Sequence, residues 1–109
     1  MRSFTLVFAL LVLASPAIAQ TMQPATITLI RTGWNSDSFA VVTAEPILNP
    51  AGCPTPDGYI SEKSLPGYST YYAAALTAYV TRRRVVITVH NSECFSERPK
   101  LIGINLTNE

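Results

Sequence analysis

STYYAAALTAYVTRRRVVITV, residues 69–89, is the most informative stretch for the fold class, because the repeat of its apolar side chains changes there from a helical period to that of a strand. From Ser69 the apolar positions recur three and four residues apart, which predicts a helix with Ser69 or Thr70 as its N-terminal cap. This stripe consists of Tyr72, Ala75, Leu76, Tyr79 and Val80. Residues 82–84 are arginines, which complement the negative C-terminal end of a helix. Residues 85–89 are β-branched and predict a strand directly after it.

Three shorter strands are predicted before the helix. Residues 25–32 alternate apolar and hydroxyl side chains, and residues 39–44 return to apolar and β-branched side chains after a turn rich in Gly, Asn, Asp and Ser. A short third strand is expected at residues 58–61. Prolines at positions 46, 50, 54 and 56 prevent a regular ladder between the second and third strands, so an irregular loop is expected there.

The chain after residue 89 is expected to add a polar loop at residues 91–100 and a fifth strand at residues 101–106. The resulting order, β-β-β-α-β-β, is that of the OB-fold, a small, mainly β, five-stranded barrel with one helix. The same elements also fit an α+β sandwich with the helix on one face of an open sheet. The side chains expected to fill the interior are Ile27, Leu29, Val41, Val85, Ile87, Val89, Ile102, Ile104 and Leu106, with Leu76, Tyr79 and Val80 from the helix.

Residues 1–19 have the features of a secretory signal peptide. Arg2 lies near the start, residues 4–14 are an apolar run, and Ala17 and Ala19 form a small-x-small cleavage site. The apolar run is about eleven residues long, whereas a helix that crosses a bilayer needs about twenty. We therefore expect an exported protein, periplasmic or secreted, with no membrane span in the mature chain, whose residues 20–109 form a single domain.

Cys53 and Cys94 are the only cysteines, and an even number in an exported chain predicts a disulfide bond. The bond would close a loop of about 40 residues, for which loop-closure entropy gives about 4 kcal/mol of stabilisation. A redox role would require closely spaced cysteines, so we expect this bond to be structural.

Charged residues are scattered and balanced. Without Arg2 the eight basic residues become seven, against seven Asp and Glu, so nucleic acid is not an expected partner. His90 is the single histidine, and no nucleophile-elbow sequence accompanies it. We therefore assign no catalytic residue and do not expect an enzyme. Dispersed carboxylates and one histidine also predict no metal site, and no cofactor is expected.

Aromatic side chains in turns are the candidate binding residues. Aromatic rings with hydroxyl and amide neighbours suit sugar rings or a protein surface, because they give contact area at low entropy cost. The best such cluster is the turn at residues 34–38, between the first two predicted strands. The predicted ligand-contacting residues are Trp34, Asn35, Ser36, Tyr59, Tyr68 and Tyr71.

The C-terminal part of the chain resembles a known family. Residues 71–79 read YYAAALTAY, residues 85–89 read VVITV, Cys94 follows, and residues 101–106 read LIGINL. Between Tyr68 and Leu106 this pattern is similar to the binding subunits of subtilase-cytotoxin and typhoid-toxin type, and to small exported bacterial proteins like them. The resemblance implies an OB-fold, pentameric assembly in some members and binding of sialylated glycans by some. It assigns no binding residue in this chain.

Two functions from different classes are consistent with these features. The first is a non-enzymatic exported binding module that recognises a glycan or a protein surface through its loops. Such a module could also assemble into a ring of identical subunits. The alternative is a structural or stress-related periplasmic protein that contacts envelope proteins and binds no small ligand. Unpaired edges at the first and fifth strands are the expected route to homo-oligomers.

Overall fold

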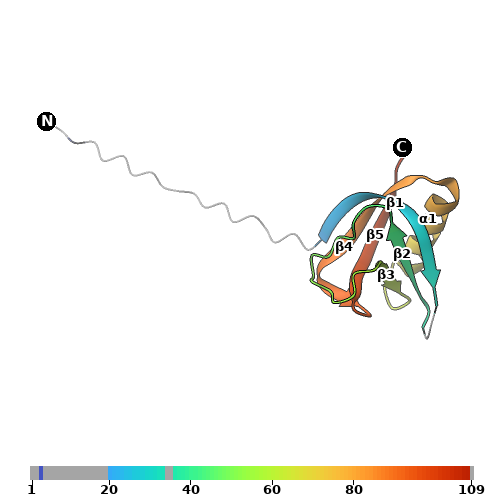
Figure 1. The fold of residues 1–109 in the computed structure, drawn as a ribbon, viewed down its shortest axis with the longest axis horizontal. Coiled ribbons are helices and arrows are strands. Elements are labelled where there is room, and N and C mark those ends of the chain that lie inside the picture. Colours follow the sequence, from blue (N-terminus) through green and yellow to red (C-terminus); the bar gives the residue numbers. More distant parts are fainter. Residues whose placement is uncertain (1–2, 4–19, 34–35, 109) are drawn as a thin grey trace.

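The first strand, β1 (Gln20–Thr32), closes the barrel because it pairs with two different strands along its length. Residues 20–26 pair antiparallel with β4 (Arg84–Phe95), and the remainder of β1 pairs antiparallel with β2 (Ser38–Thr43). A long strand that changes partner in this way joins the two halves of the sheet into one wall (Figure 1).

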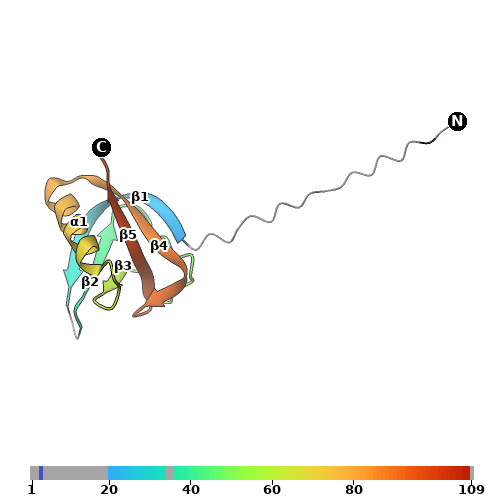
Figure 2. The same ribbon diagram turned by 180° about the vertical axis from the view of Figure 1, so that it is seen from behind.

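The other strands complete a closed ring in the order β1-β2-β3-β5-β4. The short β3 (Tyr59–Glu62) pairs antiparallel with β2 and parallel with β5 (Arg98–Leu106), and β5 pairs antiparallel with β4. The helix α1 (Tyr68–Thr81) connects β3 to β4 and packs against β1 and β5 (Figure 2). This confirms the predicted OB-like barrel, and the open-sheet alternative is wrong. Each part of β1 has one partner strand, and β3 meets β5 at one residue pair, Ile60 with Lys100, so the edges predicted at β1 and β5 stay a prediction.

The structure is a computed structural model that describes Ser3, residues 20–33 and residues 36–108. The leader predicted at residues 1–19 therefore lies, apart from Ser3, outside the described residues. Within the described part of the chain, no helix has the length and hydropathy needed to cross a membrane.

The hairpin of β4 and β5 is longer than predicted. β4 continues through the polar residues 91–93 and ends at Phe95. Since β5 begins at Arg98, only Ser96 and Glu97 connect the two strands. Both connecting residues have positive φ, 45° and 68°, as a two-residue type I′ turn requires. The predicted loop at residues 91–100 is therefore wrong. Polar side chains are compatible with a strand there because this part of the ladder faces solvent.

The barrel interior is filled by apolar side chains from all five strands and from the helix. The buried cluster consists of Ala25, Ile27, Phe39, Val41, Tyr59, Ala75, Ala78, Val85, Ile87, Val89 and Leu101. Leu29, which was predicted to point inward, is 45% exposed. A β-bulge between Ile27 and Leu29 adds one residue to β1 and reverses its alternation, so Ile30 packs against the core instead. Leu106, at the end of β5, is also 45% exposed, so its predicted inward place is wrong too.

Three helical side chains that were expected in the interior face solvent instead. Ala75 and Ala78 are buried, whereas Leu76, Tyr79 and Val80 are 41, 43 and 66% exposed. The helix has no charged residue in any turn, so its sequence does not distinguish an inner from an outer side. Small side chains on the inner side allow the helix backbone to approach the barrel closely.

Backbone hydrogen bonds terminate the helix at both ends, without a side-chain cap. Gly67 is the N-terminal cap and accepts the backbone N–H of Tyr71, so the predicted caps at Ser69 and Thr70 are wrong. At the other end Arg82 adopts a left-handed conformation with φ of 56°. The N–H groups of residues 82 and 83 then bond to carbonyls of the last helical turn.

The predicted disulfide between Cys53 and Cys94 is present and attaches the loop at residues 44–58 to β4. This loop has no regular secondary structure, as its prolines predict. The side chain of Asn49 accepts the backbone N–H of Cys53 at 2.7 Å and donates to its carbonyl at 3.0 Å. The disulfide and these hydrogen bonds hold the irregular loop against the barrel.

Candidate binding site

A hollow of about 290 Å³ lies on the outer wall of the barrel, lined by residues of both the β1–β2 turn and the β4–β5 turn. Strand register explains how its residues meet. Arg31 of β1 pairs with Ala40 of β2, and Ala40 pairs with Ile60 of β3, so these three residues form one row across the wall. The full lining consists of Arg31, Thr32, Gly33, Ser36, Ser38, Phe39, Ala40, Ile60, Ser96 and Arg98.

The hollow combines an apolar base with polar groups. Ala40 and Ile60 alternate along their strands with the core residues Val41 and Tyr59, so they point away from the interior, yet they are only 6 and 8% exposed. Four hydroxyl side chains contribute to the same lining: Thr32, Ser36, Ser38 and Ser96. Apolar contact area with a few convergent polar groups is the usual composition of a ligand site.

Two arginines of the hollow share one carboxylate. Asp57 accepts hydrogen bonds from Arg98 Nε at 2.6 Å and Nη2 at 3.2 Å, and from Arg31 Nη2 at 3.1 Å. The hydrogen bonds from Arg98, aided by those from Arg31 and opposed by partial burial, hold the pKa of Asp57 below its ordinary value. In turn, Asp57 raises the pKa of Arg98. One carboxylate therefore fixes two guanidinium groups in position.

A second depression adjoins the hollow and reaches the start of α1, where Tyr68 and Tyr72 line it together with Asp37. The Tyr68 hydroxyl donates a hydrogen bond of 2.7 Å to Asp37, and Lys63 Nζ lies 3.9 Å from the same carboxylate. Burial and the nearby carboxylate raise the pKa of Tyr68 to about 12. These contacts attach the β1–β2 turn to the helix and hold the rim between the two depressions.

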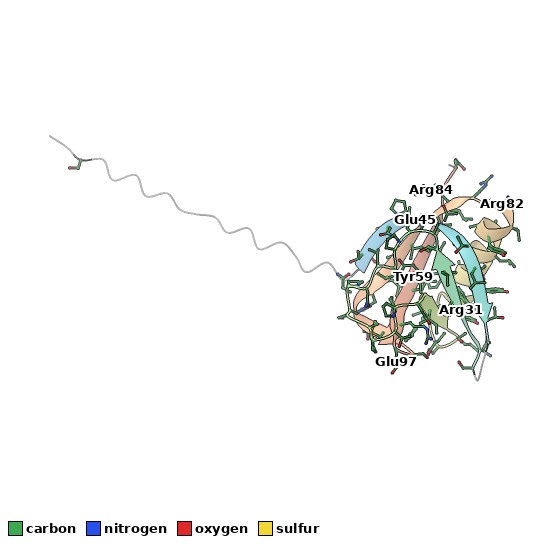
Figure 3. The ribbon with its side chains drawn as sticks, viewed as in Figure 1. Arg31, Glu45, Tyr59, Arg82, Arg84 and Glu97 are labelled. Carbon is green, nitrogen blue, oxygen red and sulfur yellow. A yellow bond between two sulfur atoms is a disulfide. The ribbon has the colours of Figure 1, made fainter. Side chains whose placement is uncertain are left out.

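The structure brings together some of the predicted contact residues and separates others. Ser36 lines the hollow, and Tyr68 lines the adjoining depression. Tyr71 packs against the core and lines neither. Tyr59 is fully buried, and its hydroxyl accepts the backbone N–H of Leu48 at 2.7 Å (Figure 3). The predicted ligand contact at Tyr59 is therefore wrong, because strand alternation points this ring into the barrel. Trp34 and Asn35 lie outside the described residues.

Sequence reasoning missed the charged part of the site. Arg98 and Asp57 are 41 positions apart, and Arg31 and Asp57 are 26 positions apart. No local pattern connects them, since only the closed barrel brings the starts of β5 and β3 beside the end of β1. The one available signal was their position, because each lies next to a predicted strand end or turn.

His90 belongs to a local network on β4. Its Nδ1 accepts the backbone N–H groups of Ser92 and Glu93 at 3.1 and 3.0 Å, and its Nε2 lies 3.0 Å from a Glu93 carboxylate oxygen. Lys100, also 3.0 Å from that oxygen, is the main cause of the lowered pKa of Glu93. Ser92 Oγ lies 3.4 Å from Nδ1, beyond the range of about 2.6–3.2 Å for an activated nucleophile. Both ring nitrogens therefore already have partners.

Elsewhere, the described residues contain no group of three or more His, Cys, Asp or Glu side chains that could hold a metal ion. A comparison of the chain with protein-family models found no match, and neither did a comparison with curated proteins. The resemblance to toxin binding subunits thus stays a prediction, and a function has to be inferred from the geometry of the hollow.

Proposed function

We propose that this protein is an exported, non-enzymatic binding module whose hollow recognises a glycan. The observation that carries the proposal is the composition of the lining, where Ala40 and Ile60 lie among four hydroxyl groups and beside two arginines. A sugar ring has an apolar C–H face and a rim of oxygen atoms. The apolar base suits the first, and the hydroxyl oxygens and guanidinium groups suit the second.

The arginine pair supports recognition because its geometry exists before any ligand arrives. Asp57 bonds both guanidinium groups, and Arg98 also donates to the Ser96 carbonyl at 2.8 Å. Long side chains that are already ordered lose less entropy on binding, so more of the contact energy appears as affinity. The local bonding of His90 supports a role without catalysis, because its Nδ1 is not free to accept a proton from a substrate.

Assembly into a ring of identical subunits is a further part of the proposal, and it derives from the resemblance. Because each part of β1 pairs with one neighbouring strand, its other edge is the expected route for contacts between copies. Light scattering of the purified protein across a dilution series reports the subunit number. A pentamer supports the ring, and a monomer at micromolar concentration contradicts it.

A variant that fills the hollow tests the glycan proposal. In Ala40→Leu the larger side chain occupies the base of the hollow without removing a hydrogen bond. We expect it to weaken binding to any glycan that the wild type selects on an array by at least about tenfold, equivalent to about 1.4 kcal/mol. The affinity for the selected glycan is then measured by titration calorimetry.

Ala44→Leu is the matched control, because Ala44 is exposed just beyond β2 and lines neither depression. It should bind as the wild type does, and thermal unfolding should show both variants folded. An array on which the wild type selects nothing contradicts glycan recognition. If crosslinking in periplasmic extract then captures specific envelope proteins, the structural alternative is favoured. Unchanged glycan affinity of Ala40→Leu places the binding site elsewhere.

A further inference from the structure

The outward side of α1 carries an apolar stripe that the barrel does not cover. Tyr79 and Val80 follow Leu76 by three and four positions, and the three side chains are 41% (Leu76), 43% (Tyr79) and 66% (Val80) exposed. Their helix has no charged residue, and no Asp or Glu occurs anywhere in residues 68–92. Aliphatic side chains with a tyrosine among them are typical of the boundary between lipid and water.

Three arginines follow this stripe directly. Arg82, Arg83 and Arg84 are exposed, and none forms an ion pair with another residue that the structure describes. The other basic side chains of residues 20–33 and 36–108, at positions 31, 63, 98 and 100, each contact a carboxylate. Positive charge without a partner is therefore concentrated at the C-terminal end of α1.

The surroundings of the arginines keep this charge in place. Figure 3 shows Arg82, Arg84 and Glu45 at one end of the barrel, and Glu45 accepts the backbone N–H of Thr26 at 2.6 Å. Among the described residues at this end, three arginines and one carboxylate leave an excess of positive charge. The left-handed residue 82 and the two N–H bonds to the last helical turn hold the arginines next to the stripe.

We propose that this end of the molecule, the stripe of Leu76, Tyr79 and Val80 with the arginines at 82–84, docks on a bilayer surface that contains anionic phospholipids. Guanidinium groups form charge-assisted hydrogen bonds with lipid phosphates, and the apolar side chains enter the boundary of the acyl region. Glu97, in the turn that also contributes Ser96 to the hollow, lies at the opposite end (Figure 3). Docking would therefore leave the hollow accessible.

Charge and size favour a lipid surface over a protein as the occupant. A symmetric contact between two copies through this face would offer the arginines no carboxylate from the helix or its flanks, since no Asp or Glu occurs in residues 68–92. A stable protein interface uses about 20–30 residues on each side, many more than this stripe and its arginines provide. A bilayer needs no complementary shape and adapts to a convex helix.

Vesicle sedimentation tests the proposal with the purified exported protein. Its mass is measured first, because the apolar residues 4–14 would bind bilayers by themselves if retained. We expect binding to vesicles of phosphatidylcholine with about one third phosphatidylglycerol, and at least about tenfold weaker binding to phosphatidylcholine alone. High salt should weaken the binding, since exposed charges are screened. The variant with Arg82→Gln, Arg83→Gln and Arg84→Gln should lose at least about tenfold in partition coefficient.

Two further variants test separate contributions to vesicle binding. One tests the apolar stripe, and the other tests whether loss of any positive charge has the same effect. Val80→Asp places a charge in the stripe at an exposed position and should also reduce partitioning. Lys63→Gln removes a positive charge whose side chain is 77% exposed in the β3–α1 connection, and should partition as the wild type does. Equal binding to both kinds of vesicle, or an unchanged partition of the triple variant, overturns the proposal. So does a dimer or larger oligomer in light scattering that Val80→Asp dissociates, because the face would then be an interface between copies.

Discussion

Asp57 is the residue on which the charged side of the hollow depends. It bonds Arg98 through two nitrogens and Arg31 through one, so a single carboxylate orients two guanidinium groups. Its side chain is 45% exposed, which limits what each pair adds to stability because water screens it. The main consequence of Asp57 is therefore positional, since it sets where the arginines present their remaining donors.

Asp57→Asn should lower the free energy of unfolding at neutral pH by about 1 kcal/mol or less, as expected for exposed ion pairs. The pKa of Asp57 is lowered in the folded state, so its contribution is present above the ordinary value of 3.8 and is lost as the pH falls below it. The difference between wild type and variant, measured by urea unfolding, should therefore shrink as the pH is lowered through this range. A difference that stays constant with pH would contradict this assignment.

Helix α1 shows how small side chains determine the orientation of an element. Its whole length is apolar or hydroxyl-bearing, and the buried positions are the alanines at 75 and 78. At its first turns Tyr68 and Tyr72 pack on Phe39, with ring centroids 5.4 and 5.3 Å apart. Close approach at the alanines and aromatic contact at the N-terminal end leave the larger aliphatic side chains outside.

Ala75→Leu should destabilise the protein by about 1–3 kcal/mol, because extra methyl groups do not fit between the helix and the barrel. Ala73→Leu introduces the same side chain on the exposed side of the same helix and should change stability by about 0.5 kcal/mol or less. Chemical unfolding of both variants measures the difference. Equal effects would mean that the alanine side of the helix is not the packed one.

At the scale of the whole molecule, a closed sheet and one cross-link hold together a chain with little regular structure between residues 44 and 58. The strands form a closed ring, and the Cys53–Cys94 bond connects the irregular loop to β4. A domain of this size gains only marginal stability from its core, so the cross-link is a large part of the total.

Replacing both cysteines, Cys53→Ser with Cys94→Ser, should lower the free energy of unfolding by about 4 kcal/mol, since the bond closes a loop with a sequence separation of 41. Urea unfolding of wild type and variant measures this difference. Reductant should shift the midpoint of the wild type and leave the variant unchanged. Equal midpoints of the wild type with and without reductant would contradict a stabilising role.

Local patterns in the sequence determined the order of the elements, the disulfide partners and the inward residues Val85, Ile87 and Val89. Each depends on information within one short segment, such as the alternation of β-branched residues along a strand or the presence of two cysteines in the chain. For the site, local patterns predicted Ser36 and Tyr68, because turns and element ends commonly carry polar and aromatic contacts.

Contacts between distant segments determine which side of α1 faces inward, where the bulge in β1 reverses its alternation, and that the last hairpin turns at Ser96 and Glu97. The tertiary structure alone placed Asp57 between arginines that are 26 and 41 positions away. The physical reason is that an uncharged helix has no intrinsic inner face and that register depends on the partner strand. Both are settled when the barrel closes and each segment meets the surfaces that it packs against.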